Sequence, residues 1–381
     1  MLKNALKLPW KQHNVPHCLI DIIRGCNVVC ENCYNTESSH VKPLQEVKDE
    51  IDLMMKHRNL HSLAIIGGEP LLHPKLDEII EYVTSKNILV ELFSNGLLLT
   101  EERLKTLHKL GVKLIFVHIE QGQIRKDLPR DATEEKVKEL RYKIARRVHN
   151  AGIEVGIIFT SYKHDMNAIN IALAEAIEER SITYLIITLF RDYTRFNSLK
   201  GDMENGFKGS MHFNKKTNEV PYSNFDVMEY MYEQFGYRPF AFLSSNRESH
   251  DPRWVSYLLA VFHQKDGGEP IYHSLKSSYL EKIFLFMHHK IKGKYPFFQE
   301  QDEKKAYTLL KLNGFFGGDL KGNQAFLKKI ANQEGELKLL RMLFQAPAQI
   351  DSDGVLSYCD TCPDAVIKDG KIVPACVGDQ L

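Results

Sequence analysis

Six of the seven cysteines in this 381-residue chain fall into two triplets near its opposite ends: Cys26, Cys30 and Cys33, and Cys359, Cys362 and Cys376. Thiolates are ligands for zinc, iron and iron–sulfur clusters, whereas secreted domains held by disulfides are much richer in cysteine. Both triplets therefore predict metal binding in a reducing compartment. The seventh cysteine, Cys18, precedes the first triplet along an apolar run, and we expect it to be an ordinary buried thiol.

The first triplet has the spacing C-x3-C-x2-C and directly follows the first apolar run of the chain. A structural zinc site normally uses four protein ligands. Three close thiols without a fourth cysteine nearby are typical of an incomplete cubane cluster, in which one iron keeps an open position. Zinc with a distant fourth ligand remains an alternative at this stage.

Further candidate site residues stand at the ends of the next three apolar runs: Gly67, Gly68 and Glu69, then Ser94 and Asn95, then His118 and Glu120. Parallel strands place their carboxyl ends along one edge of a sheet, where α/β proteins build their active sites. Glycines at such a position allow the backbone to approach a ligand closely. A histidine at a strand end is more often structural, so His118 is the weaker candidate.

These motifs resemble those of the radical S-adenosylmethionine (radical SAM) enzymes, in the same order, over residues 17–195. The resemblance implies a [4Fe–4S] cluster on the first triplet and SAM bound by the GGEP segment that begins at Gly67 and by the turn at Ser94. His118 and Glu120 would contact the ribose of SAM. It also implies a 5′-deoxyadenosyl radical that abstracts hydrogen from a substrate, with electrons from a flavodoxin or ferredoxin type of donor. One departure is Asn32, which precedes the third cysteine where many members have an aromatic residue.

The second triplet surrounds Asp369-Gly370, a dipeptide typical of a β-hairpin turn. Such a hairpin returns Cys376 to the Cys359–Cys362 pair, so the three thiols are predicted to share a site. Zinc or a single iron is an alternative here. The spacing resembles the auxiliary-cluster segment of the radical SAM enzymes that make the first molybdenum-cofactor intermediate from GTP, which implies a second [4Fe–4S] cluster. The residues after the pair, beginning with Pro363, and the end of the chain differ from those enzymes.

Six short apolar runs alternate with helical patterns in the N-terminal half; they cover residues 18–23, 62–66, 88–93, 114–119, 153–159 and 182–190. Their Ile, Val, Leu and Phe content is typical of strands buried on both faces of a parallel sheet. Thr100 and Thr133 are predicted helix N-caps, and Gly152 is predicted to follow the helix that Thr133 begins. We therefore expect an α/β fold with a partial (β/α)6 barrel, because eight units would be needed for a closed barrel.

Aromatic residues are concentrated in the middle of the chain, where residues 196–350 contain 26 of them. The alternation of strands and helices also stops there, so we expect a mostly helical, aromatic-rich region. Its aromatic residues form either an ordinary core or the lining of an apolar substrate cavity. Within it, residues 279–298 are apolar and basic by turns, which indicates a packed helix with solvated lysines or an amphipathic helix at a membrane surface.

Three regions are therefore predicted: a radical SAM core at 1–195, a substrate region at 196–350 and a cluster-binding segment at 351–381. The formal charge of +1 argues against a nucleic-acid binder that works by bulk electrostatics. We recognise no signal peptide and no run long enough to span a membrane, so we expect a cytoplasmic protein, with peripheral membrane contact left open.

The functional hypothesis is a radical SAM enzyme with one auxiliary cluster, acting on an unactivated C–H bond of an apolar substrate such as a lipid or isoprenoid. The same chemistry on a peptide, nucleotide or sugar, including cyclisation of the molybdenum-cofactor type, is an alternative. A non-enzymatic iron–sulfur or zinc protein is disfavoured because it would need no SAM-binding motifs.

Overall fold

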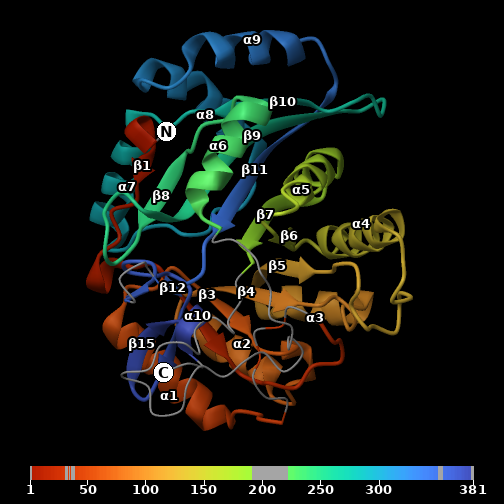
Figure 1. Cartoon of the computed structure of the whole chain (residues 1–381), viewed down its shortest axis with the longest axis vertical. Coiled ribbons are helices and arrows are strands. Elements are labelled where there is room, and N and C mark those ends of the chain that lie inside the picture. Colours follow the sequence, from red (N-terminus) through yellow and green to blue (C-terminus); the bar gives the residue numbers. More distant parts are fainter. Residues whose placement is uncertain are drawn as a thin grey trace.

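The computed structural model describes residues 2–30, 33, 35, 39–190, 222–350 and 355–378. Its main feature is an eleven-stranded sheet with the order β1-β8-β9-β11-β7-β6-β5-β4-β3-β2, and β10 pairs with β9. The two ends of this order, β1 and β2, do not pair among the described residues. The sheet is therefore open, and Figure 1 shows it curving from β2 in the lower part to β8 and β1 in the upper part.

Six parallel strands form one half of the sheet: β2 (His17–Asp21), β3 (Ser62–Ile66), β4 (Leu89–Ser94), β5 (Val112–His118), β6 (Glu154–Ser161) and β7 (Ile182–Leu189). Each strand overlaps the apolar run that predicted it. Both faces of these strands are covered; in β2, for example, Ile20 and its neighbour Leu19 point to opposite faces and both are buried. The predicted α/β fold with a partial barrel is confirmed.

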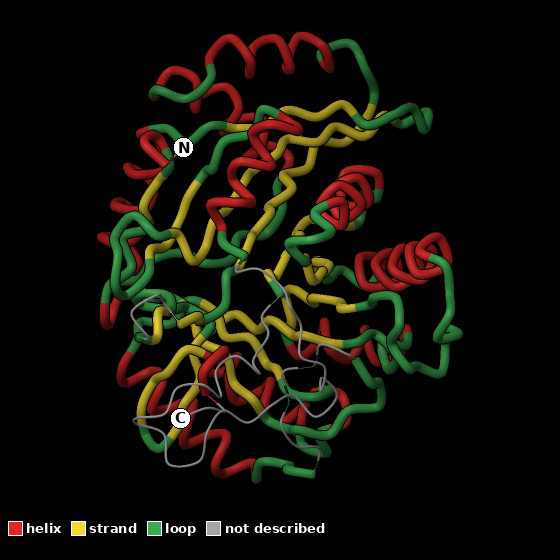
Figure 2. The backbone as a smooth tube through the Cα atoms, viewed as in Figure 1, coloured by secondary structure: helices red, strands yellow, loops and turns green. Residues whose placement is uncertain are grey.

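Five helices cover the outer face of these strands: α1 (Leu44–His57), α2 (Leu76–Ser85), α3 (Glu101–Leu110), α4 (Glu134–Asn150) and α5 (Asn167–Glu178). Thr100 caps α3 as predicted, because its side chain accepts a hydrogen bond from the Arg103 N–H. Thr133 occupies the N-cap position of α4 without a side-chain cap, and Gly152 follows the end of that helix with a positive φ of 81°. Figure 2 shows these helices at the periphery of the strands.

The aromatic-rich region contains the expected helices: α6 (Asn224–Phe235), α7 (Tyr279–Lys292), α8 (Glu303–Asn313) and α9 (Leu320–Ile330). It also contributes four strands that were not predicted: β8 (Ala241–Ser244), β9 (Pro252–Gln264), β10 (Ile271–Leu275) and β11 (Gly335–Gln345). β11 pairs in parallel with β7 and antiparallel with β9. The region therefore continues the sheet of the N-terminal half, and the boundary expected at residue 195 lies outside the described residues.

Of these strands, β11 escaped prediction because Lys338 and Arg341 interrupt its apolar pattern, whereas the apolar run of β9 was an available signal. Lys338 in β11 is buried, and its Nζ donates to the carbonyl oxygens of Glu179 and Ile182 at 2.7 Å each. Lys338 Nζ also donates to the Ala176 carbonyl in the last turn of α5 at 3.0 Å, so the lysine ties the end of that helix to the start of β7. A lysine within a buried strand has no sequence signal that reveals such distant partners.

The first residues of the chain lie at the opposite end of the sheet from β2. They form a 3-10 turn at Leu2–Asn4, the short strand β1 (Leu6–Lys7) and a second turn at Gln12–Asn14. β1 pairs in parallel with β8 of the aromatic-rich region. The N-terminal part of the predicted core at 1–195 is thus joined to the middle of the chain.

Residues 294–301 run across the N-terminal edge of the barrel strands. Lys294 Nζ donates to the carbonyl oxygens of Leu60 and Asn87, just before β3 and β4, at 3.0 and 3.3 Å. The Gln301 N–H donates to the Glu154 carboxylate at the start of β6. Phe298 packs inside the sheet against side chains of β5 and β7. This segment covers the N-terminal ends of the barrel strands, and the carboxyl ends remain available for the site.

The C-terminal part contains short strands, β12 (Gln349–Ile350) and β13 (Leu356–Ser357), then a hairpin of β14 (Ala365–Lys368) and β15 (Lys371–Pro374), then α10 (Ala375–Gly378). The predicted turn at Asp369-Gly370 is confirmed, with φ of 47° and 73°. Val366 and Ala375 pack against Leu19 of β2 and Ile66 of β3. The hairpin therefore lies against the inner face of the sheet.

Candidate active site

The first cysteine triplet lies in the loop that leaves the carboxyl end of β2, as predicted. Cys26 is exposed, Cys30 and Cys33 are half-buried, and the Cys33 N–H donates to the Cys30 carbonyl at 3.3 Å. Burial, together with the neighbouring Cys30 and Cys26 thiols, raises the pKa of Cys33 to about 11. Three thiols that disfavour one another's ionisation become stable thiolates when a cation shares them.

Side-chain amides donate hydrogen bonds to two of these three sulfurs. Asn95 Nδ2 lies 3.6 Å from Cys26 Sγ, and Gln123 Nε2 lies 3.2 Å from Cys30 Sγ. The buried guanidinium of Arg125 holds both amide residues, since it donates to the Asn95 carbonyl at 3.1 Å and to Gln123 Oε1 at 3.0 Å. The segments after β4 and β5 thus offer amide donors to the sulfurs of the cysteine loop.

Gly67 and Gly68 pack against the backbone of the cysteine loop. A Cβ on Gly68 would lie 2.3 Å from the Gly25 carbonyl oxygen, and one on Gly67 would lie 2.3 Å from the Ile23 carbonyl oxygen. The Gly68 N–H also donates to Ile23 at 2.6 Å. Gly67 and Gly68 therefore allow the close approach that was predicted, and the segment that approaches them in this structure is the backbone of the cysteine loop.

The Glu69 carboxylate is buried and joins the GGEP segment to the end of β4. It accepts hydrogen bonds from the Asn95 N–H at 2.8 Å, from Ser94 Oγ at 3.1 Å and from the Leu71 N–H at 3.1 Å. Burial raises the pKa of Glu69 to about 7, although these donors oppose the rise. The structure thus brings the predicted residues Glu69, Ser94 and Asn95 into one network.

His118 and Glu120, predicted at the end of β5, form a pair beside the cysteine loop. His118 Nε2 lies 3.2 Å from Glu120 Oε2, and the imidazole lies beside the Cys30 thiol. Burial alone would lower the pKa of His118, but the Glu120 carboxylate and Cys30 raise it to about 10. The Thr160 N–H donates to Glu120, which ties the pair to β6.

The donor set of the first loop fits a [4Fe–4S] cluster. A cubane binds each cysteine through a different iron, so its three thiolates need not converge on one point. Within the described residues, no three His, Cys, Asp or Glu side chains are arranged to hold a single metal ion. Cys26, Cys30 and Cys33 would hold the cluster, while Asn95 and Gln123 donate to its sulfur ligands. Asn32, beside the third cysteine, lies outside the described residues.

The second triplet lies at the inner face of the sheet. Cys359 and Cys362 are buried in an apolar cluster with Trp10 and Trp254. The adjacent Cys359 thiol and burial together raise the pKa of Cys362. The hairpin returns Cys376 to this segment, because the N–H of the preceding residue donates to the Asp364 carbonyl at 2.8 Å.

The remaining cysteine, Cys18, is buried on the helix side of β2, within the core that contacts α1. Burial raises the pKa of its thiol to about 11, and Arg58 Nη1 donates to its sulfur at 3.4 Å. This environment agrees with the expectation of an ordinary buried thiol.

Sequence reasoning missed several residues of the site because they carry no local motif. Gln123 and Arg125 follow β5 in an ordinary polar loop. His17 and Glu91 lie inside the sheet, with His17 Nδ1 3.8 Å from the Glu91 carboxylate and the Phe297 ring stacked on the imidazole at 4.0 Å. The one available sequence signal was Glu91, because a glutamate is unusual within a strand that is buried on both faces.

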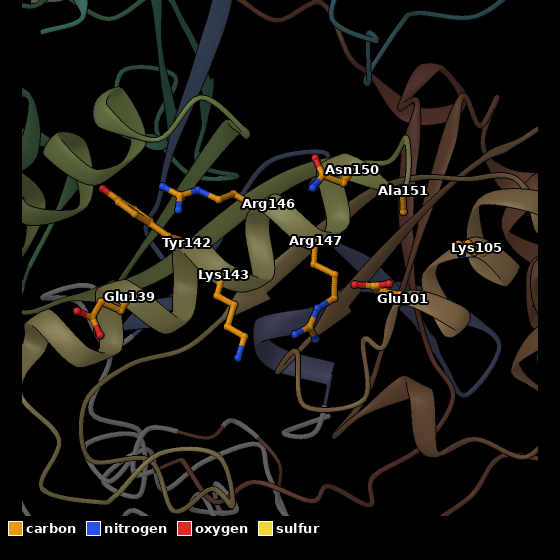
Figure 3. A pocket seen from close by; sticks show the side chains of 9 residues that line it. All are labelled: Glu101, Lys105, Glu139, Tyr142, Lys143, Arg146, Arg147, Asn150 and Ala151. Carbon is orange, nitrogen blue, oxygen red and sulfur yellow. The ribbon is translucent and has the colours of Figure 1, made fainter. Parts of the chain in front are cut away.

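A hollow of about 740 Å³ lies on the outer surface between α3 and α4. Figure 3 shows the side chains of Lys143, Arg146 and Arg147 projecting from α4, with Glu101 opposite on α3. None of its lining residues belongs to either cysteine triplet. This hollow is therefore separate from the candidate site.

The fold and the site define an α/β protein with a three-cysteine cluster loop at the carboxyl edge of an open parallel sheet. Residues 20–180 match the family model of the radical SAM superfamily, so this part of the chain is a radical SAM domain. Members use SAM and a [4Fe–4S] cluster. None of the described helices has the length and apolar character needed to cross a membrane.

Curated relatives resemble parts of the chain. It is 29% identical to the subtilosin biosynthesis protein AlbA of Bacillus subtilis over 26% of this chain and 22% of that protein. It is 26% identical to Fe-coproporphyrin III synthase of Methanosarcina barkeri over 47% of this chain and 46% of that protein. The chain thus spans less than half the length of these relatives.

Solved structures are also similar to this chain. Streptococcus suis SuiB bound to S-adenosylmethionine shows 16% identity and a TM-score of 0.41, covering 58% of this chain and 49% of that chain. The enzyme anSMEcpe with bound AdoMet shows 17% identity and a TM-score of 0.40 over 58% of this chain and 57% of that chain.

Proposed function

We propose that this protein is a radical SAM enzyme that acts on an unactivated C–H bond with the help of one auxiliary [4Fe–4S] cluster. The observation that best supports this proposal is the first cysteine loop at the carboxyl edge of the sheet. Its thiols receive amide hydrogen bonds from Asn95 and Gln123. The cluster and SAM together supply a 5′-deoxyadenosyl radical that abstracts hydrogen from the substrate.

The residues of the chain have distinct roles in this proposal. Cys26, Cys30 and Cys33 hold the cluster, while the GGEP segment and Ser94 bind the methionine part of SAM. Glu69 fixes the relative position of these two segments through its bonds to Asn95 and Ser94. The pair of His118 and Glu120 faces the ribose.

We assign the auxiliary cluster to Cys359, Cys362 and Cys376. Its support is the hairpin that returns Cys376 to the Cys359–Cys362 segment and packs inside the sheet. The hairpin lies against the inner face of β2 and β3, which supports a second site that faces the interior of the barrel. It would bind substrate or pass electrons there.

The substrate in this proposal is largely apolar, such as a lipid chain or isoprenoid. The apolar lining around Cys359 and Cys362, which includes Trp10 and Trp254, supports this class. A peptide, nucleotide or sugar is the alternative, and the protein would use a low-potential flavodoxin or ferredoxin in a reducing cytoplasm. SuiB, one similar protein, has been solved bound to a precursor peptide.

Anaerobic reconstitution tests this function. We expect about eight irons per chain, four for each cubane, and 5′-deoxyadenosine formed from SAM only when a strong reductant is present. A triple Ala variant of Cys26, Cys30 and Cys33 should lose SAM cleavage and half of the iron. The matched control is Cys18→Ala, which removes a buried thiol outside both triplets and should retain all of the iron.

The second triplet is tested separately. A triple Ala variant of Cys359, Cys362 and Cys376 should contain about four irons and still cleave SAM slowly, without forming product. Four irons in the unaltered protein would remove the auxiliary cluster from the proposal. No 5′-deoxyadenosine from the fully loaded protein with strong reductants would contradict the enzymatic function.

A further inference from the structure

Helix α7 presents an apolar face to solvent. Its exposed large apolar side chains are 43–69% exposed, and they are Tyr279, Ile283, Phe284, Phe286, Met287 and Ile291. Leu285 is the one buried residue of this helix and packs toward the body of the protein against Leu6 and Ala241. The apolar side chains opposite Leu285 therefore have no role in the core.

The exposed side chains form a continuous stripe. Tyr279, Ile283, Met287 and Ile291 recur at intervals of four residues, which places them on one side of the helix. The turn after α8 extends the stripe, since Phe315 is 70% exposed and a Cβ on the nearby Gly317 would lie 3.3 Å from the Tyr279 ring of α7. We call α7 together with Phe315 and Phe316 the α7 face.

Positive charge accompanies the α7 face. Lys282 and Lys290 lie over the exposed rings of Tyr279 and Phe286, with Nζ 5.1 and 5.8 Å from the ring centroids. The helix has one carboxylate, Glu281, which turns back to accept hydrogen bonds from the Ser278 N–H and hydroxyl at its own N-terminus. The lysines are thus not neutralised from within the helix.

We propose that the α7 face binds the surface of an anionic phospholipid bilayer, with the helix lying in the plane of the interface. A stripe of aromatic and branched residues bordered by lysines suits the boundary between acyl chains and anionic headgroups. The helix of 14 residues is about 21 Å long, too short to cross a hydrocarbon core of about 30 Å.

A second copy of the chain is a poorer occupant. In a two-fold interface the same patch meets itself, so Lys282 and Lys290 of each copy would face lysines of the other. The α7 face offers no free carboxylate of its own helix to offset this repulsion. Charge complementarity therefore favours a negatively charged lipid surface.

Vesicle co-sedimentation of the full-length, cluster-loaded protein under anaerobic conditions tests this surface. We expect binding to vesicles of phosphatidylcholine mixed with phosphatidylglycerol, and binding weaker by roughly tenfold or more to phosphatidylcholine alone or at high salt. No binding to the mixed vesicles would overturn the proposal. Because this assay involves no SAM chemistry, its failure is distinguishable from failure of the proposed enzymatic function.

Two variants locate the binding surface. Phe286→Ser with Ile291→Ser, and separately Lys282→Glu with Lys290→Glu, should each lower the partition coefficient by roughly tenfold or more. All four side chains are exposed, so we expect unchanged circular dichroism and iron content.

The matched control removes two exposed apolar side chains from a different helix: Phe225→Ser with Tyr232→Ser in α6, which are 49% and 45% exposed. It should bind vesicles like the unaltered protein. Equal loss in this control would contradict the assignment to α7. A concentration-dependent dimer that the α7 variants abolish, without vesicle binding, would show that a second copy covers this face and would overturn the proposal.

Discussion

The buried carboxylate of Glu69 and the backbone N–H of Asn95 are hydrogen-bonded at 2.8 Å, which joins the segment after β3 to the end of β4. Asn95 in turn contacts Cys26 through its side chain. One carboxylate thus positions both a predicted SAM-binding segment and a donor to a cluster ligand.

Glu69→Gln should therefore destabilise the site, because the new amide presents a donor where the buried carboxylate accepted N–H and O–H groups. We expect the free energy of unfolding of the metal-free protein to fall by about 1–3 kcal/mol. Urea unfolding measures this change, and Glu78→Gln on the exposed side of α2 is the control. Equal effects of the two substitutions would contradict the role of the buried network.

Gly68→Ala should displace the cysteine loop, because the added methyl group would overlap the Gly25 carbonyl oxygen. We expect the variant to fold but to retain less iron after reconstitution and desalting. Gly267→Ala is the control, since a Cβ there meets open space, and the strain from its positive φ of 83° lies far from the cysteine loop in the turn after β9. Full iron retention by the Gly68 variant would show that the loop can yield without losing its ligands.

Gln123→Leu should lower the midpoint reduction potential of the cluster. An N–H donor to a ligand sulfur stabilises the extra negative charge of the reduced cluster, so its loss makes reduction harder. Potentiometric titration followed by electron paramagnetic resonance measures the shift at unchanged iron content. Gln121→Leu is the control, because that amide donates to the Ala132 carbonyl. A potential that stays constant would exclude a tuning role for Gln123.

Glu91→Gln should change how stability depends on pH. Burial raises the pKa of Glu91 to about 8, and the group is fully enclosed by the sheet. A carboxyl group with a raised folded-state pKa stabilises the fold below its unfolded value near 4.5. It loses that contribution as the pH rises through the folded value.

Between about pH 5 and pH 8, the unaltered protein should therefore lose on the order of 3 kcal/mol of unfolding free energy relative to Glu91→Gln. Urea unfolding of the metal-free, reduced protein at several pH values measures the difference. The exposed Glu233→Gln variant should follow the unaltered protein. Parallel curves for Glu91→Gln would mean that Glu91 is already ionised in the fold.

The six barrel strands were predictable because parallel strands buried on both faces leave continuous apolar runs. β11 was not, since Lys338 and Arg341 interrupt it and have partners far away in sequence, whereas the apolar run of β9 after Arg253 was a signal that could have predicted that strand. The expected mostly helical region therefore proved to continue the sheet.

The predicted site residues were recognised by motif and by position at strand ends, and the structure brings Glu69, Ser94 and Asn95 together. Gln123 was not predicted, because its contact with Cys30 spans 93 residues and a glutamine in a polar loop has no distinctive pattern. Local patterns identify ligands well, whereas donors to those ligands depend on tertiary folding.

The segment at 294–301 has a consequence for the order of folding. The strands from β2 to β7 are complete by residue 189, yet the residues that cover their N-terminal ends are synthesised about a hundred positions later. β11, which covers the edge of β7, follows later still. A nascent chain would thus expose an unpaired strand edge and an apolar interior until most of the protein has emerged. Such high contact order predicts slow folding and a need for chaperones during synthesis.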